Sequence, residues 1–259
     1  MAFLQVQFFS KALEVASTVN VILPERSMGI GVEAKGGDAL PKVLYLLHGY
    51  SDDHSIWMRR TSVERYAAAH ELAVIMPAVN HSFYTNEAFG ERYWDYVSEE
   101  LPEIMHRFFR LSARAEDTYV AGLSMGGYGA LKLALTHPER FAAAGSFSGA
   151  VDIADMGHRN AESLANMRRI FGDVEGIAGS DNDLFHLLEK NAACPRRPRL
   201  YVSCGTADFL YHQHQKFVPA ARALGWDVTH AEKPGATHEW GFWDEQIARF
   251  IPWMLGAEE

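Results

Sequence analysis

The sequence is poor in cysteine and has no long run of apolar residues. Its 259 residues include only two cysteines, Cys194 and Cys204, which are too few for a disulfide framework. No segment approaches the roughly 20 consecutive apolar residues that a membrane-spanning helix requires. The N-terminal segment has neither the charged region nor the apolar core of a secretory signal. These absences predict a cytoplasmic protein with no membrane partner.

The chain also lacks a strongly basic region. Lysine and arginine together number 24, against 33 acidic residues, which gives a net charge of −9. Binding to a phosphate backbone requires clustered positive charge, so we expect no nucleic-acid partner. Arg196, Arg197 and Arg199 form the densest basic group, but prolines interrupt them before an expected strand, which indicates a solvated loop. The composition allows a homo-oligomer without predicting one.

Short apolar runs alternate with helical patterns along the chain. The expected strands cover residues 5–9, 18–23, 43–47, 72–76, 118–121, 142–147, 200–204 and 228–232. Helical spacing of apolar residues covers about 63–70, 99–110, 125–136, 211–224 and 241–254. This alternation is typical of βαβ units. It predicts an α/β fold with a doubly wound, mostly parallel sheet and helices on both faces.

The alternation is interrupted once, after the sixth expected strand. Residues 151–191 are richer in glycine and polar residues than their surroundings. We expect a small cap-like insertion there, with one or two short helices over the sheet. No linker, repeat or low-complexity tract divides the chain, so residues 1–259 are predicted to form a single domain.

A Gly-x-Ser-x-Gly motif stands at residues 122–126. An apolar run precedes it and a helical pattern rich in small residues follows it, so Ser124 is expected on a sharp turn between a strand and a helix. Glycine at positions 122 and 126 removes Cβ atoms that would crowd this turn. In this setting the motif predicts that Ser124 is the nucleophile of an α/β-hydrolase.

A serine hydroxyl becomes a useful nucleophile when a base takes its proton and an acid orients that base. In α/β-hydrolases the order along the chain is serine, acid, histidine. Asp208 lies just after the expected strand 200–204, and His238 lies between the last strand and the terminal helix. We therefore predict a triad of Ser124, Asp208 and His238. Glu239 is expected to support the helix start and not to replace Asp208.

Two backbone N–H groups are predicted to bind the oxyanion. Met125 begins the helix after the nucleophile, where unpaired donors and the helix dipole favour negative charge. The second donor should come from the loop after strand 43–47, where we choose Tyr50. Gly49 would leave space for the substrate carbonyl, and His48 would hold the geometry of the loop.

Aromatic residues are dense near the expected active face. Those predicted to contact substrate, together with Gly49, are Trp57, Tyr84, Trp94, Phe209 and Trp240. Residues 80–96 mix polar and aromatic side chains after a strand end, as active-site loops do. His212 and His214 are two residues apart and do not share a helix face, and no dinucleotide fingerprint is present. We therefore expect no metal and no cofactor.

Several segments of the chain resemble segments of a known protein family. They are residues 43–49, 122–129, 147–150, 204–205 with 208–211, and 237–240. In this order they resemble the bacterial tributyrin esterases, within the esterase D and S-formylglutathione hydrolase group of the α/β-hydrolase superfamily. The resemblance covers nearly the whole chain and is weakest over 151–191. It implies a fold without a large lid, a preference for short-chain acyl esters, and the triad and oxyanion residues named above.

The sequence thus predicts a serine carboxylesterase that cleaves a small-molecule ester through an acyl-enzyme intermediate. An acyltransferase with the same triad is an alternative, because the same relatives include mycolyltransferases, in which an alcohol resolves the acyl-enzyme. S-formylglutathione and feruloyl (thio)esterases are further alternatives. The intact triad disfavours a binding protein that merely keeps the fold.

Overall fold

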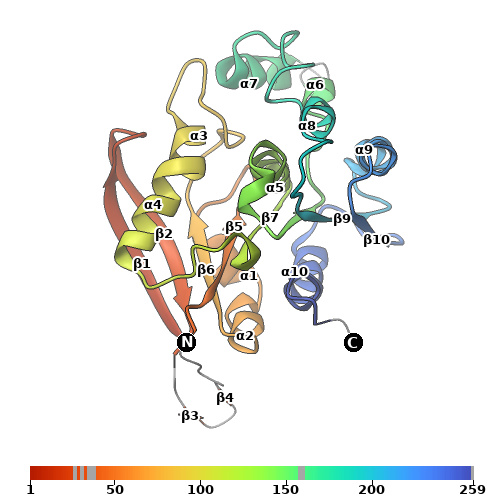
Figure 1. Cartoon of the computed structure of the whole chain (residues 1–259). Coiled ribbons are helices and arrows are strands. Elements are labelled where there is room, and N and C mark those ends of the chain that lie inside the picture. Colours follow the sequence, from red (N-terminus) through yellow and green to blue (C-terminus); the bar gives the residue numbers. More distant parts are fainter. Residues whose placement is uncertain (26–27, 30–31, 34–38, 157–160, 258–259) are drawn as a thin grey trace.

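The computed structural model describes residues 1–25, 28–29, 32–33, 39–156 and 161–257 (Figure 1). Its centre is an eight-stranded sheet with the order β1-β2-β6-β5-β7-β8-β9-β10. The strands of this sheet are β1 (Ala2–Ser10), β2 (Val15–Leu23), β5 (Lys42–Leu47), β6 (Leu72–Pro77), β7 (Thr118–Leu123), β8 (Ala143–Phe147), β9 (Arg199–Gly205) and β10 (Val228–Lys233). A separate antiparallel pair consists of β3 (Met28–Gly29) and β4 (Val32–Glu33).

The main sheet is parallel except at one edge. β1 pairs antiparallel with β2, and β2 pairs antiparallel with β6. Every pairing from β6 to β10 is parallel. The predicted doubly wound, mostly parallel sheet is therefore confirmed. Parallel strands end at the same edge, so the loops after β5, β7, β9 and β10 meet there.

Helices cover both faces of the sheet (Figure 1). They are α1 (Ile56–Arg60), α2 (Val63–Ala68), α3 (Tyr93–Asp95), α4 (Leu101–Phe108), α5 (Met125–Thr136), α6 (Ile153–Met156), α7 (Ala161–Phe171), α8 (Leu184–Lys190), α9 (Tyr211–Ala223) and α10 (Trp240–Met254). Side chains from α4, α5, α8 and α9 share one apolar cluster, and side chains from α1, α2 and α10 share the other.

The sequence of β5 explains why both faces need covering. Successive strand residues point to opposite faces, and every residue from Val43 to Leu47 is apolar and buried. Val43, Tyr45 and Leu47 belong to the first cluster, whereas Leu44 and Leu46 belong to the second. Burying such a side chain contributes about 1.5–3 kcal/mol, so each face gains by packing helices over it.

Two helical predictions differ from the structure. The predicted helix over 99–110 is shorter, because a π-helical turn covers Tyr96–Glu100 and α4 ends at Phe108. Pro102 lacks an N–H, and this costs least in the first turn of an α-helix, which suits a helix beginning at Leu101. The segment 151–191 holds α6, α7 and α8, which is more than the one or two helices expected.

Among the helices of the described residues, none combines the length and the apolar character that crossing a bilayer requires.

Candidate active site

Ser124 occupies the tight turn between β7 and α5. Its backbone has φ 52° and ψ −117°, a strained conformation for a residue with a side chain. Its N–H donates to the carbonyl of Phe147 at 2.9 Å. Its own carbonyl accepts from the N–H groups of Tyr128 (3.1 Å) and Ala150 (3.2 Å). These three backbone hydrogen bonds hold the strained turn in place.

The glycines on either side of Ser124 are required by close backbone packing. A Cβ on Gly122 would lie 2.4 Å from the carbonyl oxygen of Gly126. A Cβ on Gly126 would lie 2.4 Å from the carbonyl oxygen of Leu47 and 2.7 Å from that of His48. These neighbours are backbone atoms and cannot rotate away. The end of β5 therefore packs directly against the first turn of α5.

The loop after β5 lies beside the nucleophile turn. A Cβ on Gly49 would lie only 2.6 Å from Cδ1 of Leu123, the residue before Ser124. The next residue, Tyr50, is half-buried, and its ring stacks on His81 with centroids 4.2 Å apart. Met125 is the first residue of α5. The two predicted oxyanion donors thus come from segments that pack against each other.

His48 fixes the shape of this loop. The N–H of Val79 donates to Nε2 of His48 at 3.0 Å, and Nδ1 lies 2.7 Å from the carbonyl oxygen of Gly49. Because Nε2 accepts, the proton is on Nδ1, which donates to Gly49. Burial lowers the pKa of His48 to about 4, so the imidazole is neutral at physiological pH. The hydroxyl of Tyr84 donates to the His48 carbonyl at 2.9 Å.

Asp208 and His238 form a hydrogen-bonded pair. Nδ1 of His238 lies 2.8 Å from Oδ2 of Asp208, whose side chain is fully buried. The other carboxylate oxygen accepts from the N–H of Leu210 at 2.9 Å. Burial would raise the pKa of Asp208, but the hydrogen bonds from His238 and Leu210 outweigh it, and the pKa is lowered overall. The carboxylate therefore stays ionised and can orient the imidazole.

Two aromatic rings pack against the imidazole of His238. The ring of Phe209 lies 4.7 Å from it and that of Trp243 lies 4.8 Å from it, centroid to centroid. The His238 side chain remains 19% exposed, so one part of it is open to solvent. The Ser124 hydroxyl makes no hydrogen bond to another described residue, and its approach to His238 stays a prediction.

Three of the residues expected to contact substrate are held by contacts within the protein. Trp57 is 1% exposed, and its indole N–H donates to the carbonyl of Leu47 at 3.0 Å. Tyr84 is also fully buried, because its hydroxyl anchors the loop at His48. The ring of Trp94 stacks on His137, the residue after α5, and lies 4.5 Å from the ammonium of Lys132 on α5. Packing and hydrogen bonding explain the positions of these three side chains, and their contact with substrate stays a prediction.

The other two aromatic residues remain candidates for contact with substrate. Phe209 is 57% exposed although its ring packs on His238. Trp240 is half-buried and packs edge-on against both Trp57 and Trp243. Phe209 is thus the aromatic residue best placed to meet a ligand beside the imidazole.

A polar cavity of about 490 Å³ opens beside the loop after β5. Its lining residues are Tyr50, Ser51, Asp52, Asn80, His81, Glu87, Phe89, Gly90, Glu91, Tyr93, Asn166 and Arg169. Burial raises the pKa of Asp52 above its ordinary value, whereas its hydrogen bond with Gly49 and the charges of Arg60 and His238 lower it. A Cβ on Gly49 would lie 2.9 Å from Oδ2 of Asp52, so the cavity adjoins the loop that packs on Leu123, the residue before Ser124.

One wall of this cavity joins two segments that are distant in sequence. The guanidinium of Arg169, on α7, pairs with the carboxylate of Glu87. The N–H groups of Ala88 and Phe89 donate to the carbonyls of Ile170 (2.7 Å) and Arg169 (3.1 Å). The composition of residues 80–96 indicated this loop, but nothing in the sequence indicated α7 as its partner.

Lys132 ties the same loop to the segment before α8. It is buried on α5, where its ammonium donates to the hydroxyl of Thr85 and to Oδ1 of Asn182, the latter at 2.8 Å. The ammonium also lies 4.5 Å from the ring centroid of Trp94. Burial lowers the pKa of Lys132 to about 7. Sequence reasoning missed this residue because a lysine within an apolar helix usually reaches solvent.

Comparisons with known proteins agree with this geometry. The esterase family model described as "Putative esterase" matches residues 10–254. An acetyl esterase of Caldicellulosiruptor saccharolyticus is 32% identical over 262 residues, which cover 98% of each chain. The MPT51 antigen of Mycobacterium leprae is 32% identical over 99% of this chain and 95% of its own.

Two solved structures from Staphylococcus aureus are similar throughout. The fluorophosphonate-binding serine hydrolase FphF is 35% identical, with a TM-score of 0.87 and 98% of both chains covered. The S-formylglutathione hydrolase FrmB is 35% identical with the same coverage and a TM-score of 0.82. The chain therefore belongs to the esterase D-like esterase family and is a serine hydrolase of carboxylic esters with the α/β-hydrolase fold.

Proposed function

We propose that the protein hydrolyses short-chain acyl esters through an acyl-enzyme intermediate on Ser124. The observation that carries the proposal is the strained turn at φ 52°, which presents a serine between a strand and the N-terminus of α5. Strain at a residue held by surrounding hydrogen bonds is characteristic of functional sites. In an esterase of this fold, that serine is the nucleophile.

In the proposed first half-reaction, Oγ of Ser124 attacks the ester carbonyl while Nε2 of His238 takes the hydroxyl proton. Asp208 accepts the hydrogen bond from Nδ1, which sets the tautomer and stabilises the imidazolium. Collapse of the tetrahedral intermediate breaks the bond to the leaving alcohol, which receives the proton from His238. Water then repeats the sequence and releases the acid from Ser124.

The backbone N–H groups of Tyr50 and Met125 are proposed to bind the oxyanion. Support comes from the packing of Gly49 on Leu123, which sets the loop after β5 beside the start of α5. A helix N-terminus favours negative charge. One such donor contributes about 3–4 kcal/mol to the stabilisation of a transition state.

We further propose that the acyl group is small and that the alcohol occupies the polar cavity. The similarity to an acetyl esterase supports a small acyl group. The cavity beside Tyr50 carries carboxylates, an amide and a guanidinium on Asp52, Asn80, Glu91 and Arg169. Such groups suit a leaving alcohol with several hydroxyls better than an apolar chain.

The test is a kinetic series over p-nitrophenyl esters from acetate to decanoate, with a glutathione thioester and a feruloyl ester alongside. We expect kcat/KM to be highest for the shortest acyl groups. A maximum at long chains, or on the thioester or feruloyl ester, would overturn the substrate class. Product analysis in the presence of glycerol shows whether water or an alcohol accepts the acyl group. Predominant transfer of the acyl group to glycerol would contradict the proposed hydrolysis.

Fluorophosphonate labelling tests the nucleophile separately. Ser124→Ala should abolish labelling and lower turnover by roughly 10⁴- to 10⁶-fold. Ser62→Ala is the matched control, because Ser62 makes no side-chain capping bond at α2. Labelling that persists in Ser124→Ala would place the nucleophile elsewhere.

A further inference from the structure

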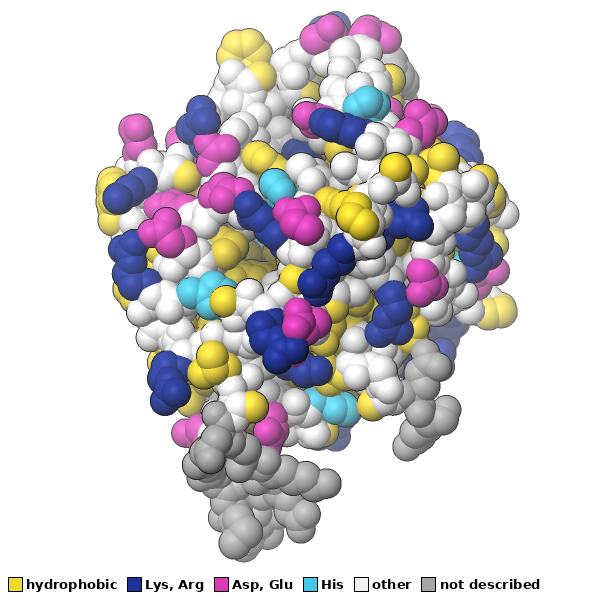
Figure 2. Space-filling view, in the orientation of Figure 1, with side chains coloured by type: hydrophobic (Ala, Val, Ile, Leu, Met, Phe, Trp, Pro, Cys, Tyr) yellow, Lys and Arg dark blue, Asp and Glu magenta, His cyan; other side chains and the backbone are white. Residues whose placement is uncertain are grey.

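A second cavity lies on the α4–α5 face of the sheet, and no residue of the predicted triad lines it. It measures about 300 Å³, with Tyr45 and Leu47 of β5 at its floor and α4 and α5 at its sides. Figure 2 shows a hollow with hydrophobic side chains at its floor on this face. Thr118, the first residue of β7, lines it, whereas Ser124 follows the other end of that strand. Leu47, which pairs in register with Gly122, lines the other end of the cavity, so the cavity extends along the sheet from the start of β7 toward the nucleophile turn.

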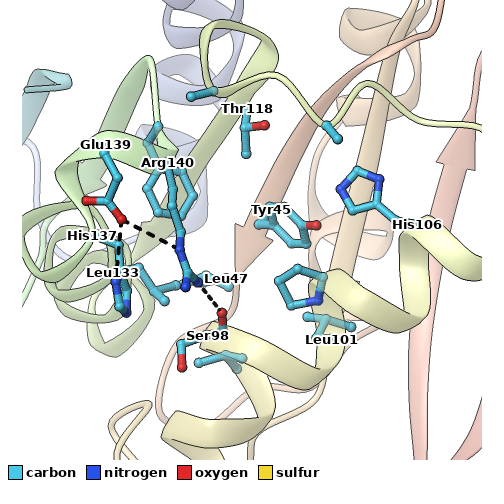
Figure 3. A pocket seen from close by; sticks show the side chains of 15 residues that line it. Tyr45, Leu47, Ser98, Leu101, His106, Thr118, Leu133, His137, Glu139 and Arg140 are labelled. Atoms are coloured by element: carbon cyan, nitrogen blue, oxygen red, sulfur yellow. Dashed lines mark hydrogen bonds and ion pairs between the residues drawn. The ribbon is translucent and has the colours of Figure 1, made fainter. Parts of the chain in front are cut away.

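The hydroxyl of Tyr45 is directed into this cavity without a partner. Tyr45 is 5% exposed, and its hydroxyl makes no hydrogen bond within the described residues. Figure 3 shows this hydroxyl pointing toward the side of the cavity where His106 lies. On the adjacent strand, by contrast, the buried hydroxyl of Tyr119 donates to the carbonyl of Glu116 at 3.1 Å. A buried hydroxyl normally has a hydrogen-bond partner, so the Tyr45 group is free to pair with a molecule that enters the cavity.

The charged groups at the cavity are already paired with one another. The guanidinium of Arg140 donates to the carbonyl of Ser98 at 2.8 Å and to Glu99 at 3.0 Å (Figure 3 shows the first bond). Glu139 lies 3.8 Å from Arg140 and 3.9 Å from Nδ1 of His137. Burial lowers the pKa of His137, so its imidazole is neutral at physiological pH. The cavity therefore offers no unpaired charge to an ionic ligand.

The remaining lining is mostly apolar, with Ser98, His106 and Thr118 as its polar residues, and burial lowers the pKa of His106. The apolar side chains include Leu47, Val97, Leu101, Pro102, Leu133 and Phe141. Ligand cavities of this kind bind mostly through apolar contact, and a few polar groups fix the orientation. We propose that this cavity binds a small, uncharged, mainly apolar molecule with one hydroxyl, of the aromatic-alcohol class, whose hydroxyl pairs with that of Tyr45.

The proposal is tested with 2-naphthol as the probe. The protein is first treated with a fluorophosphonate, which occupies the Ser124 site. The treated protein is titrated with 2-naphthol by calorimetry, and its crystals are soaked in 2-naphthol. We expect density for the probe between α4 and α5, within hydrogen-bond distance of the Tyr45 hydroxyl. Tyr45→Phe should weaken binding roughly fivefold, and the matched variant Tyr119→Phe should leave it unchanged.

The two variants also separate a ligand site from a packing defect. Tyr45→Phe removes an unpaired hydroxyl and should not lower the Tm of the free protein, whereas Tyr119→Phe removes a hydrogen bond and should. Three outcomes would overturn the proposal. They are equal affinity of Tyr45→Phe and wild type for 2-naphthol, density for the probe only outside this cavity, and an ordered water alone on the Tyr45 hydroxyl at saturating 2-naphthol. Failure of fluorophosphonate labelling would count against the proposed function only, because the crystal locates the probe independently.

Discussion

The imidazole of His238 and the buried carboxylate of Asp208 are joined by a hydrogen bond of 2.8 Å that spans two loops. The loops follow β9 and β10, neighbouring parallel strands whose register pairs Glu232 with Cys204. A Cβ on Gly205 would lie 2.1 Å from the carbonyl oxygen of Ala236, so glycine lets the two loops pack in direct contact. The pair is therefore positioned by the sheet and not by mobile side chains alone.

Asp208→Asn should lower kcat by roughly 10⁴-fold while KM changes little, because an amide favours the wrong tautomer of His238. Steady-state kinetics on p-nitrophenyl acetate measures both constants. Asp227→Asn, an exposed aspartate before β10, is the control and should match wild type. Activity within tenfold of wild type in Asp208→Asn would mean that another acid orients the imidazole.

Gly122→Ala should destabilise the protein by about 1–3 kcal/mol, because its Cβ would lie 2.4 Å from a carbonyl oxygen. Denaturant unfolding measures the free-energy change. Gly241→Ala is the matched control, since nothing lies within 4 Å of its Cβ position in α10, and it should be neutral or stabilising by up to ~1 kcal/mol. Equal effects in both variants would contradict close packing at the nucleophile turn.

Tyr84→Phe should cost roughly 1–2 kcal/mol of stability, because the buried carbonyl of His48 loses its donor. It should also lower kcat while KM changes less, because His48 belongs to the loop that holds the proposed oxyanion donor. Unfolding curves and steady-state kinetics provide the two readouts. Tyr45→Phe serves as the comparison, and an unchanged stability and kcat in Tyr84→Phe would show that the loop does not depend on this bond.

Lys132→Met should remove a pH dependence of stability. The folded-state pKa of Lys132 is about 7, below the ordinary value of about 10.4. Between these values the unfolded chain binds more protons, so stability is highest above about pH 10 and falls toward pH 7. Unfolding free energies of wild type and variant from pH 7 to 10 should diverge by up to about 1.4 kcal/mol per pH unit. Parallel curves would show that Lys132 titrates normally.

The sequence contained enough information to predict the sheet and the nucleophile turn. Apolar runs such as 43–47 and 118–121 lie within β5 and β7, and α5 has the predicted bounds of Met125–Thr136. The need for glycine at positions 122 and 126 could be predicted because the steric limits at the turn are local. Asp208 and His238 could be chosen because each follows a strand whose carboxyl end reaches the same edge.

The lining of the substrate site could not be predicted in the same way. Trp57 and Tyr84 follow strands near the active edge, but sequence position does not show whether an aromatic ring points into the core. Both side chains are buried, with hydrogen bonds to the carbonyls of Leu47 and His48. Arg169 reaches the cavity only through tertiary packing of α7, and no periodicity links it to Glu87. Long-range side-chain pairing of this kind leaves no local pattern.

The backbone bonds between residues 88–89 and 169–170 also bear on how this wall of the cavity can open. Two segments joined by paired amides and an ion pair cannot swing apart one at a time without leaving carbonyls unsatisfied. Whatever enters the cavity must therefore fit its width or displace the loop and α7 together. Selectivity for bulky alcohols would then depend on how rigidly residues 88–89 are held to residues 169–170. Amide hydrogen exchange at Ala88 and Phe89 measures this rigidity directly.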